Sequence, residues 1–194
     1  MRFRRDTPPD WPTGVKRMAR NKREQDRDEK RDEIAAAARL LFMEEGYEAT
    51  SISRLASAAG VAPNTIYWYF KDKDEVLVAV LDAELLARMG EYLVLPAMSV
   101  AERLLWVANQ LERVSRLVGT VHSRLAQSPA INTWHDRFHA LSEELLRLEL
   151  RQAGIAPQKI EALVKISVFT IEGLLAHPLP EEQKRAICAA LVIV

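Results

Sequence analysis

Apolar residues recur through most of the chain at intervals of three and four, which is the spacing of one buried face of an α-helix. From Ile34 they fall at positions 34, 37/38, 41 and 42, and Gly46 then supplies a typical helix stop. Ser51 is a favourable N-cap type, so a second helix is expected from there to about Ala59, where Gly60 ends it. A third short helix is expected within VAPNTIYWYFKDK, residues 61–73.

Longer amphipathic helices follow. Asp72 with Glu75 has the form of a capping box that opens a fourth helix. Ser99 with Glu102 opens the next helix, which Gly119 is expected to interrupt before a short helical piece at 122–127. Three more helices are expected, from 134 to a stop at 154, over 157–176, and over 180–194. No segment alternates apolar and polar residues between hairpin turns, so the sequence predicts an all-α fold.

The composition is that of an ordinary globular chain, since 48% of the 194 residues are hydrophobic and 28% are charged. The longest apolar runs fall far short of the roughly 20 residues that cross a bilayer, and the basic N-terminus is followed by no apolar signal segment. Cys188 is the single cysteine, which excludes an internal disulfide and a cysteine-based zinc finger. We therefore expect a cytoplasmic protein, with Cys188 as a buried packing residue rather than a redox sensor.

Charge is segregated along the chain although its formal net charge is zero. The first 23 residues carry eight Lys and Arg against two Asp, and a dense mixed-charge run follows. We expect residues 1–30 to form a flexible basic arm, which is either a solvated tail or a segment that contacts DNA. Residues 1–17 could alternatively precede a translation start at Met18. Because the net charge is zero, any DNA binding must come from locally placed groups.

The spacing of three small or aliphatic residues is that of a helix-turn-helix. If Ile52 is position 1, then Ala56, Gly60 and Ile66 fall at positions 5, 9 and 15. A small residue at 56 lets the second helix pack closely, a glycine at 60 allows a positive φ in the turn, and an aliphatic residue at 66 seals the pair. The sequence therefore predicts an N-terminal three-helix DNA-binding unit.

Four consecutive aromatic residues occupy positions 67–70. Successive side chains on a helix point about 100° apart, so four in a row cannot all enter the core. Ile66 and Phe70 are four residues apart and are expected to point inward together. Tyr67, Trp68 and Tyr69 are then displaced onto other faces, where rings with a polar group suit the groove and phosphates of DNA.

The segment from 34 to 80 resembles the TetR family of one-component repressors. The run TIYWYFKDK at 65–73 is the most recognisable segment of that family, and GYEATS at 46–51 matches its approach to the second helix. The resemblance implies a homodimer, associated with the bacterial nucleoid, that binds a palindromic operator and leaves it when a small-molecule effector occupies the C-terminal domain. It divides the chain, after the arm, into a helix-turn-helix domain at 31–76 and a helical effector-binding and dimerisation domain at 77–194.

By position, the resemblance also assigns contacts with double-stranded DNA. Ser51, Tyr67 and Lys73 would hold phosphates. The remaining six would lie against bases or backbone: Ser53, Pro63, Asn64, Thr65, Trp68 and Tyr69. Ser53 stands where some relatives have a longer basic side chain, and Pro63 with Asn64 replaces a frequent small residue plus glycine, so no operator sequence can be transferred.

The middle and last helices supply two further sets of candidates. Effector pockets are mainly apolar with few polar anchors, and the candidates here are Arg103, Trp106, Asn109, His122, Trp134, Phe138, Phe169 and Glu172. Each of them could instead be ordinary core. The last two helices carry more apolar surface than one small bundle hides, and the family forms its dimer there, which gives as interface candidates Ile171, Leu174, Leu175, Ile187, Leu191 and Val192.

Other functions have weaker support. His135 and His139 have the four-residue spacing of a metal pair, but no other ligand cluster accompanies them, so they are expected to border a pocket or the surface. No Gly-rich phosphate loop, activated nucleophile or paired metal motif is present, so neither an enzyme nor a cofactor is expected. The remaining alternative is a DNA-binding adaptor of the same shape without a ligand. A roomy apolar cavity would favour the regulator, and a solid core would favour the adaptor.

Overall fold

The computed structural model describes residues 15–192, and in that range all regular structure is α-helical. This confirms the all-α fold class. The helices, in chain order, are α1 (Val15–Glu44), α2 (Ile52–Ala58), α3 (Pro63–Tyr69), α4 (Lys73–Leu93), α5 (Val100–Arg113), α6 (Ser115–Arg124), α7 (Pro129–Gln152), α8 (Pro157–Ala176) and α9 (Glu181–Val192).

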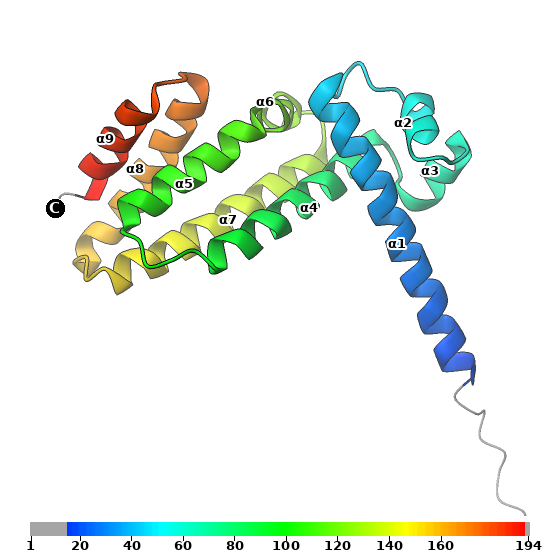
Figure 1. Ribbon diagram of the computed structural model, residues 1–194, viewed down its shortest axis with the longest axis horizontal. Helices are drawn as coiled ribbons and strands as arrows, with labels where there is room; N and C mark the ends of the chain where they lie inside the picture. Colours follow the sequence, from blue (N-terminus) through cyan, green and yellow to red (C-terminus); the bar gives the residue numbers. More distant parts are fainter. Residues whose placement is uncertain (1–14, 193–194) are drawn as a thin grey trace, which may run out of the picture.

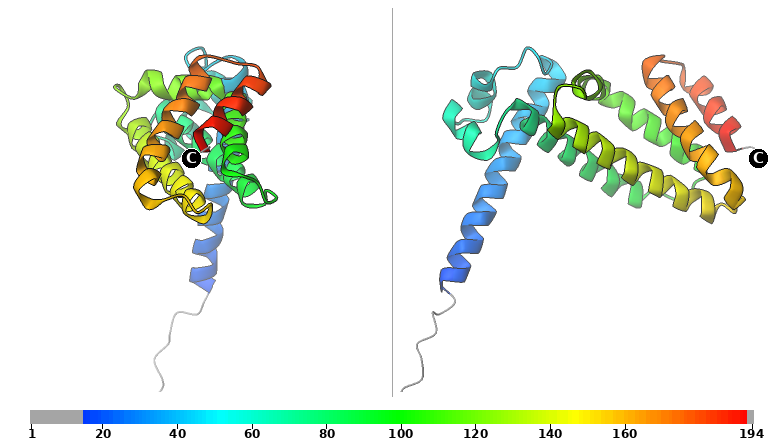
Figure 2. Two further views of the ribbon diagram at one scale, coloured as in Figure 1. Left: turned by 90° about the vertical axis from the view of Figure 1, so that its left-hand side faces the viewer. Right: turned by 180° about the vertical axis from the view of Figure 1, so that it is seen from behind.

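The molecule is elongated, with the short helices at one end (Figure 1). The long α1 passes beside α2 and α3 and projects beyond them, whereas α4, α5 and α7 run lengthwise through the middle and α8 and α9 lie at the far end. The view from behind gives the same order (Figure 2). Within the described residues no helix is long and apolar enough to cross a membrane.

Polar side chains cap several helix starts where the sequence predicts them. Ser51 accepts a hydrogen bond from the amide of Arg54 at the start of α2. Ser99 and Glu102 form a complete capping box on α5. Asp72 caps α4 through the amide of Glu75, but the Glu75 carboxylate accepts from the amide of Lys71 rather than from that of Asp72. The second half of that predicted box is therefore shifted by one residue.

Two sequence predictions about helix boundaries are wrong. The chain is helical from Val15, so residues 15–30 are not an irregular arm. This stretch is rich in Lys, Arg, Glu and Gln, which are strong helix formers, and the Gln25–Glu29 pair adds a contact one turn apart. The rest of the predicted arm, residues 1–14, lies outside the described residues.

The second error concerns Gly119, which does not interrupt a helix. The break lies at Val114, whose φ of −114° and ψ of 24° separate α5 from α6, and α6 continues through Gly119. A glycine inside a helix costs only about 1 kcal/mol, which tertiary packing can offset.

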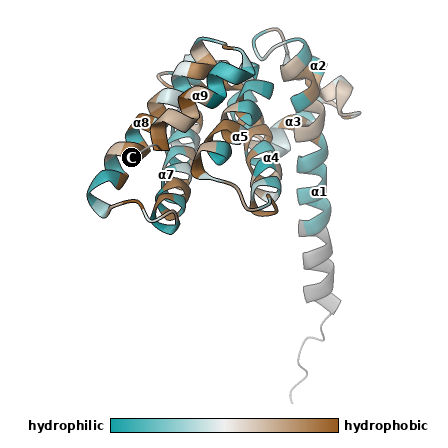
Figure 3. Cartoon of the chain, turned by 60° about the vertical axis from the view of Figure 1, so that its left-hand side comes forward, coloured by the Kyte–Doolittle hydropathy of each residue, from teal (hydrophilic) through white to brown (hydrophobic). Residues whose placement is uncertain are grey.

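The core consists of two clusters of buried apolar residues. The first cluster contains residues of the four helices α1 through α4, of α6 and of the start of α7. Its fully buried members include Phe42, Leu55 and Leu77. The second joins α5, the end of α7, α8 and α9, and includes Cys188. Burial raises the pKa of the Cys188 thiol, which fits the predicted packing role. In Figure 3 hydrophobic and hydrophilic residues alternate along the middle and last helices, as expected of helices that are buried on one face.

Candidate nucleic-acid interface and ligand cavity

The turn between α2 and α3 has the geometry that the spacing predicts. Ala56 and Ile66 are completely buried where the two helices meet. The Val61 amide donates to the Ala56 carbonyl over 3.0 Å, which closes the turn. Gly60 has a φ of +66°, and a Cβ there would meet no atom within 4 Å. The requirement for glycine is therefore conformational rather than steric crowding.

The aromatic run divides between core and surface as predicted. Phe70 is 1% exposed and Ile66 is fully buried, whereas Tyr67 is 55% exposed and Trp68 is 77% exposed. Tyr69 is half-buried against the first core cluster, and its carbonyl accepts from Arg31 Nη1 over 3.1 Å. Two neighbouring aromatic rings that are mostly exposed on a packed helix indicate a surface that a partner covers.

The other predicted DNA contacts lie on the same short helices. Ser51, at the α2 N-cap, and Ser53, in its first turn, are exposed. Pro63 opens α3 with a backbone angle that suits a first helical turn. Pro63 and Asn64 are exposed and Thr65 is half-buried. All of these residues except Thr65 are therefore open to solvent.

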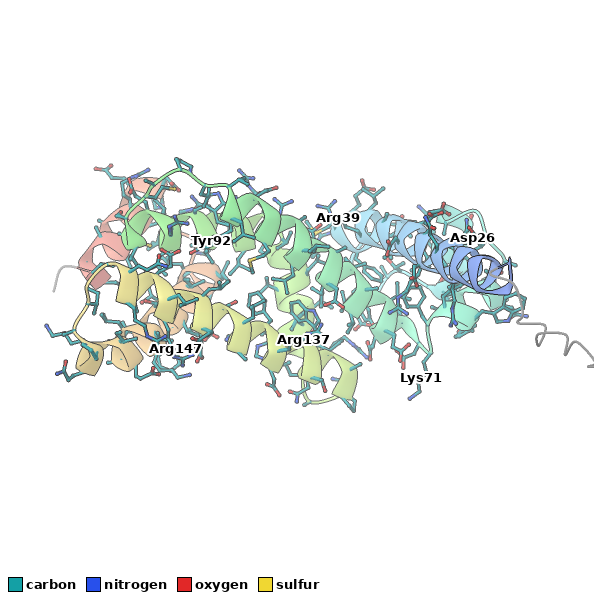
Figure 4. The ribbon with its side chains drawn as sticks, turned by 90° about the horizontal axis from the view of Figure 1, so that it is seen from below. Asp26, Arg39, Lys71, Tyr92, Arg137 and Arg147 are labelled. Carbon is teal, nitrogen blue, oxygen red and sulfur yellow. The ribbon has the colours of Figure 1, made fainter. Side chains whose placement is uncertain are left out.

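Lys73 has a structural role that sequence reasoning missed. Its Nζ donates to the carbonyls of Tyr47 and Thr50 over 2.8 and 3.1 Å, and lies 4.1 Å from the centre of the Tyr47 ring. Burial lowers the pKa of this ammonium. The side chain thus ties the loop before α2 to the start of α4, and a phosphate contact would have to use its remaining N–H. Lys71 is exposed and points away from the helices (Figure 4).

A half-buried polar network links α4 and the loop before α2 to α6, and the sequence analysis missed this network as well. Arg124, at the end of α6, binds Asp74 of α4 with two parallel hydrogen bonds, Nε to Oδ1 over 2.7 Å and Nη2 to Oδ2 over 3.0 Å. The Tyr47 hydroxyl donates to the same carboxylate, and burial together with this bond raises the pKa of Tyr47. Burial alone would raise the pKa of Asp74, but the hydrogen bonds from Arg124, Tyr47 and Ser128 lower it.

A second arginine of α6, Arg116, binds the C-terminal end of α1. Arg116 Nη1 donates to the Met43 and Glu44 carbonyls at the end of α1 over 2.8 and 2.7 Å. Cations at a helix C-terminus complement its unpaired carbonyls. No sequence pattern predicts the hydrogen bonds of Arg116 and Arg124, because each side chain binds a partner more than 45 residues away in the chain.

A partly open cavity of about 240 Å³ lies between α4, α5, α6, α7 and α8. That volume is many times the roughly 10–15 Å³ that one water needs. Most of its wall is aliphatic or aromatic. Six of the predicted pocket residues line it, namely Arg103, Trp106, His122, Trp134, Phe138 and Glu172.

Two predicted pocket residues lie elsewhere. Asn109 is on the side of α5 that faces α9, where its amide donates to Glu181 and its carbonyl oxygen accepts from Lys184. Phe169 is 67% exposed, because the cavity side of α8 is formed by neighbours such as Val168 and Glu172. A sequence shows which residues share one face of a helix, but it does not show which neighbouring helices that face contacts.

Polar residues occur at two ends of the cavity. At one end the imidazoles of His135 and His139 meet with their Nε2 atoms 3.1 Å apart, and the His122 ring centre lies 5.5 Å from that of His135. Burial lowers the pKa of His135, as do its two histidine neighbours. Among the described residues, no three His, Cys, Asp or Glu side chains are arranged to hold a metal. Both histidines line the cavity.

The other end contains three residues that sequence reasoning missed, Arg88, Tyr92 and Glu149. Tyr92 lies between the α4 and α7 ribbons and donates to Glu149 over 3.2 Å (Figure 4). Arg103 stands 5.2 Å above the Tyr92 ring. Arg88 could have been predicted from the sequence, because it follows the apolar stripe of α4 at a position that faces inward.

The residues predicted for a dimer interface are partly or fully covered by the rest of this chain. Leu174 is 7% exposed in the second core cluster. Ile171 and Leu175 line the cavity, and residues 187, 191 and 192 pack partly buried on the second cluster. The exposed apolar side chains of α8 are Ile166 at 48% and Phe169 at 67%. Because α8 is apolar around much of its circumference, its sequence did not reveal which face is outward.

The exposed aromatic helix-turn-helix is joined to a bundle of longer helices with a mainly apolar cavity. Residues 34–80 match the model of the tetR family of bacterial regulatory proteins.

Two relatives match the chain over part of their length. The Fatty acid metabolism regulator protein of Bacillus subtilis (strain 168) is 28% identical over 146 residues, which are 75% of this chain and 66% of that protein. The HTH-type transcriptional regulator AcrR of Shigella flexneri is 44% identical over 59 residues, 30% of this chain and 27% of that protein. The matches thus span less than two thirds of these relatives.

Solved structures share the fold over most of the chain. A transcriptional regulator from Rhodococcus sp. Rha1 superposes with a TM-score of 0.69 at 20% identity, covering 83% of this chain and 92% of that one. Salmonella enterica GusR superposes with a TM-score of 0.63 at 19% identity, covering 85% and 96%.

Proposed function

We propose that the chain is a homodimeric repressor that binds a palindromic operator through α3 and releases it when a small molecule occupies the cavity. The protein would act in the bacterial cytoplasm, on the nucleoid. The observation that carries the DNA-binding half is the exposure of Trp68 and Tyr67, at 77% and 55%, on a helix whose Ile66 and Phe70 are locked in the core.

The shape of the exposed surface suits a major groove. α3 has seven residues, about 10 Å of helix, which fits a groove about 12 Å wide. Asn64 and Thr65, in its first turn, would face base edges, and the Tyr67 hydroxyl would reach phosphate. Two such helices about 34–36 Å apart in a dimer would meet successive turns of one operator.

The cavity supports effector release over the adaptor alternative. A space of about 240 Å³ with a mainly apolar wall suits an apolar small molecule, whereas a solid core would have favoured an adaptor. The Bacillus relative is named a fatty acid metabolism regulator, which is compatible with such an effector.

Two helices connect the cavity to the DNA-binding helices. α4 begins beside α3 and lines the cavity with Leu81 and Leu85. α6 lines it with Val118 and Val121, and grips the DNA-binding helices through the arginine contacts described above. A ligand that favours one position of α6 or α4 would shift the dimer between two geometries by its difference in affinity for them.

Dimerisation would use the exposed α8 face around Ile166 and Phe169.

The test is a search for operator fragments followed by measurement of affinity. Full-length protein should enrich genomic fragments that share an inverted repeat, and Trp68→Ala should weaken binding to them more than tenfold. Leu93→Ala is the matched control, because Leu93 is 71% exposed at the other end of α4. Failure to enrich any fragment at low ionic strength would refute DNA binding. Release would be refuted if ligands shown to fill the cavity left operator affinity unchanged.

A further inference from the structure

The polar residues of the cavity differ in charge at its two ends. Fourteen residues of α7 separate His135 at one end from Glu149 at the other, about 21 Å at 1.5 Å per residue. Between them the wall is formed by apolar side chains such as Phe138, Leu145 and Leu146. The cavity is therefore long and apolar with a distinct polar group at each end, which suits a linear amphiphile.

At the Glu149 end two arginines line the cavity wall, Arg88 and Arg103, together with the carboxylates of Glu84 and Glu149. Glu84, one turn before Arg88, is paired with Arg39 of α1. Glu91 meets Arg88 over 3.2 Å from an exposed position outside the cavity wall.

Both arginines also have unused donors there. The Nε atoms of Arg88 and Arg103 are buried and have no hydrogen-bond partner among the described residues. Arg103 Nε lies 3.2 Å from a Glu149 oxygen, which is close enough for an ion pair, but its N–H is not directed at that oxygen. Buried donors without acceptors are costly, so an acceptor in the cavity that either guanidinium group could turn toward would relieve part of this cost.

The opposite end disfavours an anion. Glu172 contributes a carboxylate there, 3.9 Å from His139 Nε2. The lowered pKa of His135, caused by burial and by its neighbours, leaves that imidazole uncharged near neutral pH. A bound anion is therefore directed toward the arginines.

We propose that the cavity binds a long-chain carboxylate, with its head group on Arg88 and Arg103 and its chain running toward Trp134 and Phe138. Guanidinium groups match a planar carboxylate because they offer parallel N–H donors. The stacked rings of Trp134 and Phe138, 5.3 Å apart, would contact the end of the chain beside the histidines. This assignment rests on the proposed effector function and specifies the class of ligand.

The test compares three probes of equal chain length on the full-length protein by isothermal titration calorimetry. Dodecanoate should bind at least tenfold more tightly than dodecanol, and dodecyltrimethylammonium should bind more weakly than either. Arg88→Gln and Arg103→Gln should each weaken dodecanoate roughly tenfold to a hundredfold, as expected for loss of a charged hydrogen-bond donor, and leave dodecanol unchanged. Arg103→Lys should retain part of the affinity, because it keeps the charge.

Arg137→Gln is the control, because Arg137 pairs with Asp82 on the surface and is 61% exposed. If Arg103→Gln lowers the melting temperature, because Glu149 loses its partner, Arg88→Gln remains the decisive variant. Equal binding of dodecanoate and dodecanol, or unchanged dodecanoate binding by Arg88→Gln, would overturn the proposal.

Parallel operator titrations separate this proposal from the proposed function. If dodecanoate binds through the arginines but the operator stays bound, the ligand class holds and effector release fails. If dodecanoate does not bind while the operator does, the ligand class fails and DNA recognition stands.

Discussion

Replacing Arg124 by methionine should loosen the attachment of α6 to the DNA-binding helices. The substitution removes two charge-assisted hydrogen bonds to Asp74, of 2.7 and 3.0 Å, while keeping the apolar stem. The side chains of Arg124 and Asp74 are only 19% and 15% exposed, so water replaces little of what is lost. The contact with Glu48, which is 79% exposed, contributes little.

The magnitude follows from this geometry. Hydrogen bonds to charged groups contribute about 1.5–3 kcal/mol, and breaking a fully buried pair costs about 3–5 kcal/mol. The Asp74 carboxylate keeps the Tyr47 hydroxyl as a donor. We therefore expect Arg124→Met to lower the free energy of unfolding by about 2–3 kcal/mol, and the melting temperature by roughly 4–12 °C for a chain of this size.

The assay is urea unfolding at several pH values, with Arg137→Met as control. Arg137 forms a similar pair with Asp82, but the two side chains are 61% and 49% exposed, so its loss should cost less than about 1 kcal/mol. The folded-state pKa of Asp74 is depressed below its ordinary value of 3.8, so its stabilisation is present above that pH and is lost as pH falls through the folded-state pKa. The difference between wild type and Arg124→Met should shrink over the same range. Equal costs for the two variants at neutral pH would refute the buried role of this pair.

Three further substitutions test the DNA-binding helices. Gly60→Ala should lower the free energy of unfolding by about 1–2 kcal/mol in urea titrations, because φ is +66° at this residue, and an unchanged midpoint would contradict that cost. Asn64→Ala should change operator preference at one base pair by about 1–3 kcal/mol in competition binding, whereas uniform weakening across sequences would indicate a backbone contact instead. Lys73→Met should lower stability by about 1–3 kcal/mol, since Nζ holds the carbonyls of Tyr47 and Thr50; a loss of operator affinity without a loss of stability would point to phosphate contact alone.

Local features were predictable because their causes are local. The caps at Ser51 and Ser99, the positive φ at Gly60, and the opposite directions of Phe70 and Trp68 follow from side-chain type and helical period alone. The cavity was anticipated as a feature of the domain, together with several aromatic residues in its wall. The caps, the turn and the directions of the aromatic rings need only neighbours within about two helical turns, whereas the cavity was expected from the resemblance to the TetR family.

Features that depend on distant partners were not predictable. In the sequence Arg124 resembles the many other charged residues. Only the folded structure places it beside Asp74 of α4, which is 50 residues away in the chain. Phe169 satisfies the same apolar pattern as Val168, and only the packing of α8 shows that one faces outward and the other lines the cavity. Helix period restricts a residue to a face, but tertiary contacts determine what that face meets.

The burial of Cys188 makes the chain convenient for spectroscopic labelling. Its sulfur is shielded by α5 and α8, and burial raises the pKa of its thiol, so maleimide and methanethiosulfonate reagents should spare it. A cysteine introduced by Ser57→Cys on the exposed side of α2 would then be the reactive thiol of each subunit. Paired spin labels at that position would report how far apart the two recognition elements of a dimer stand, with and without ligand.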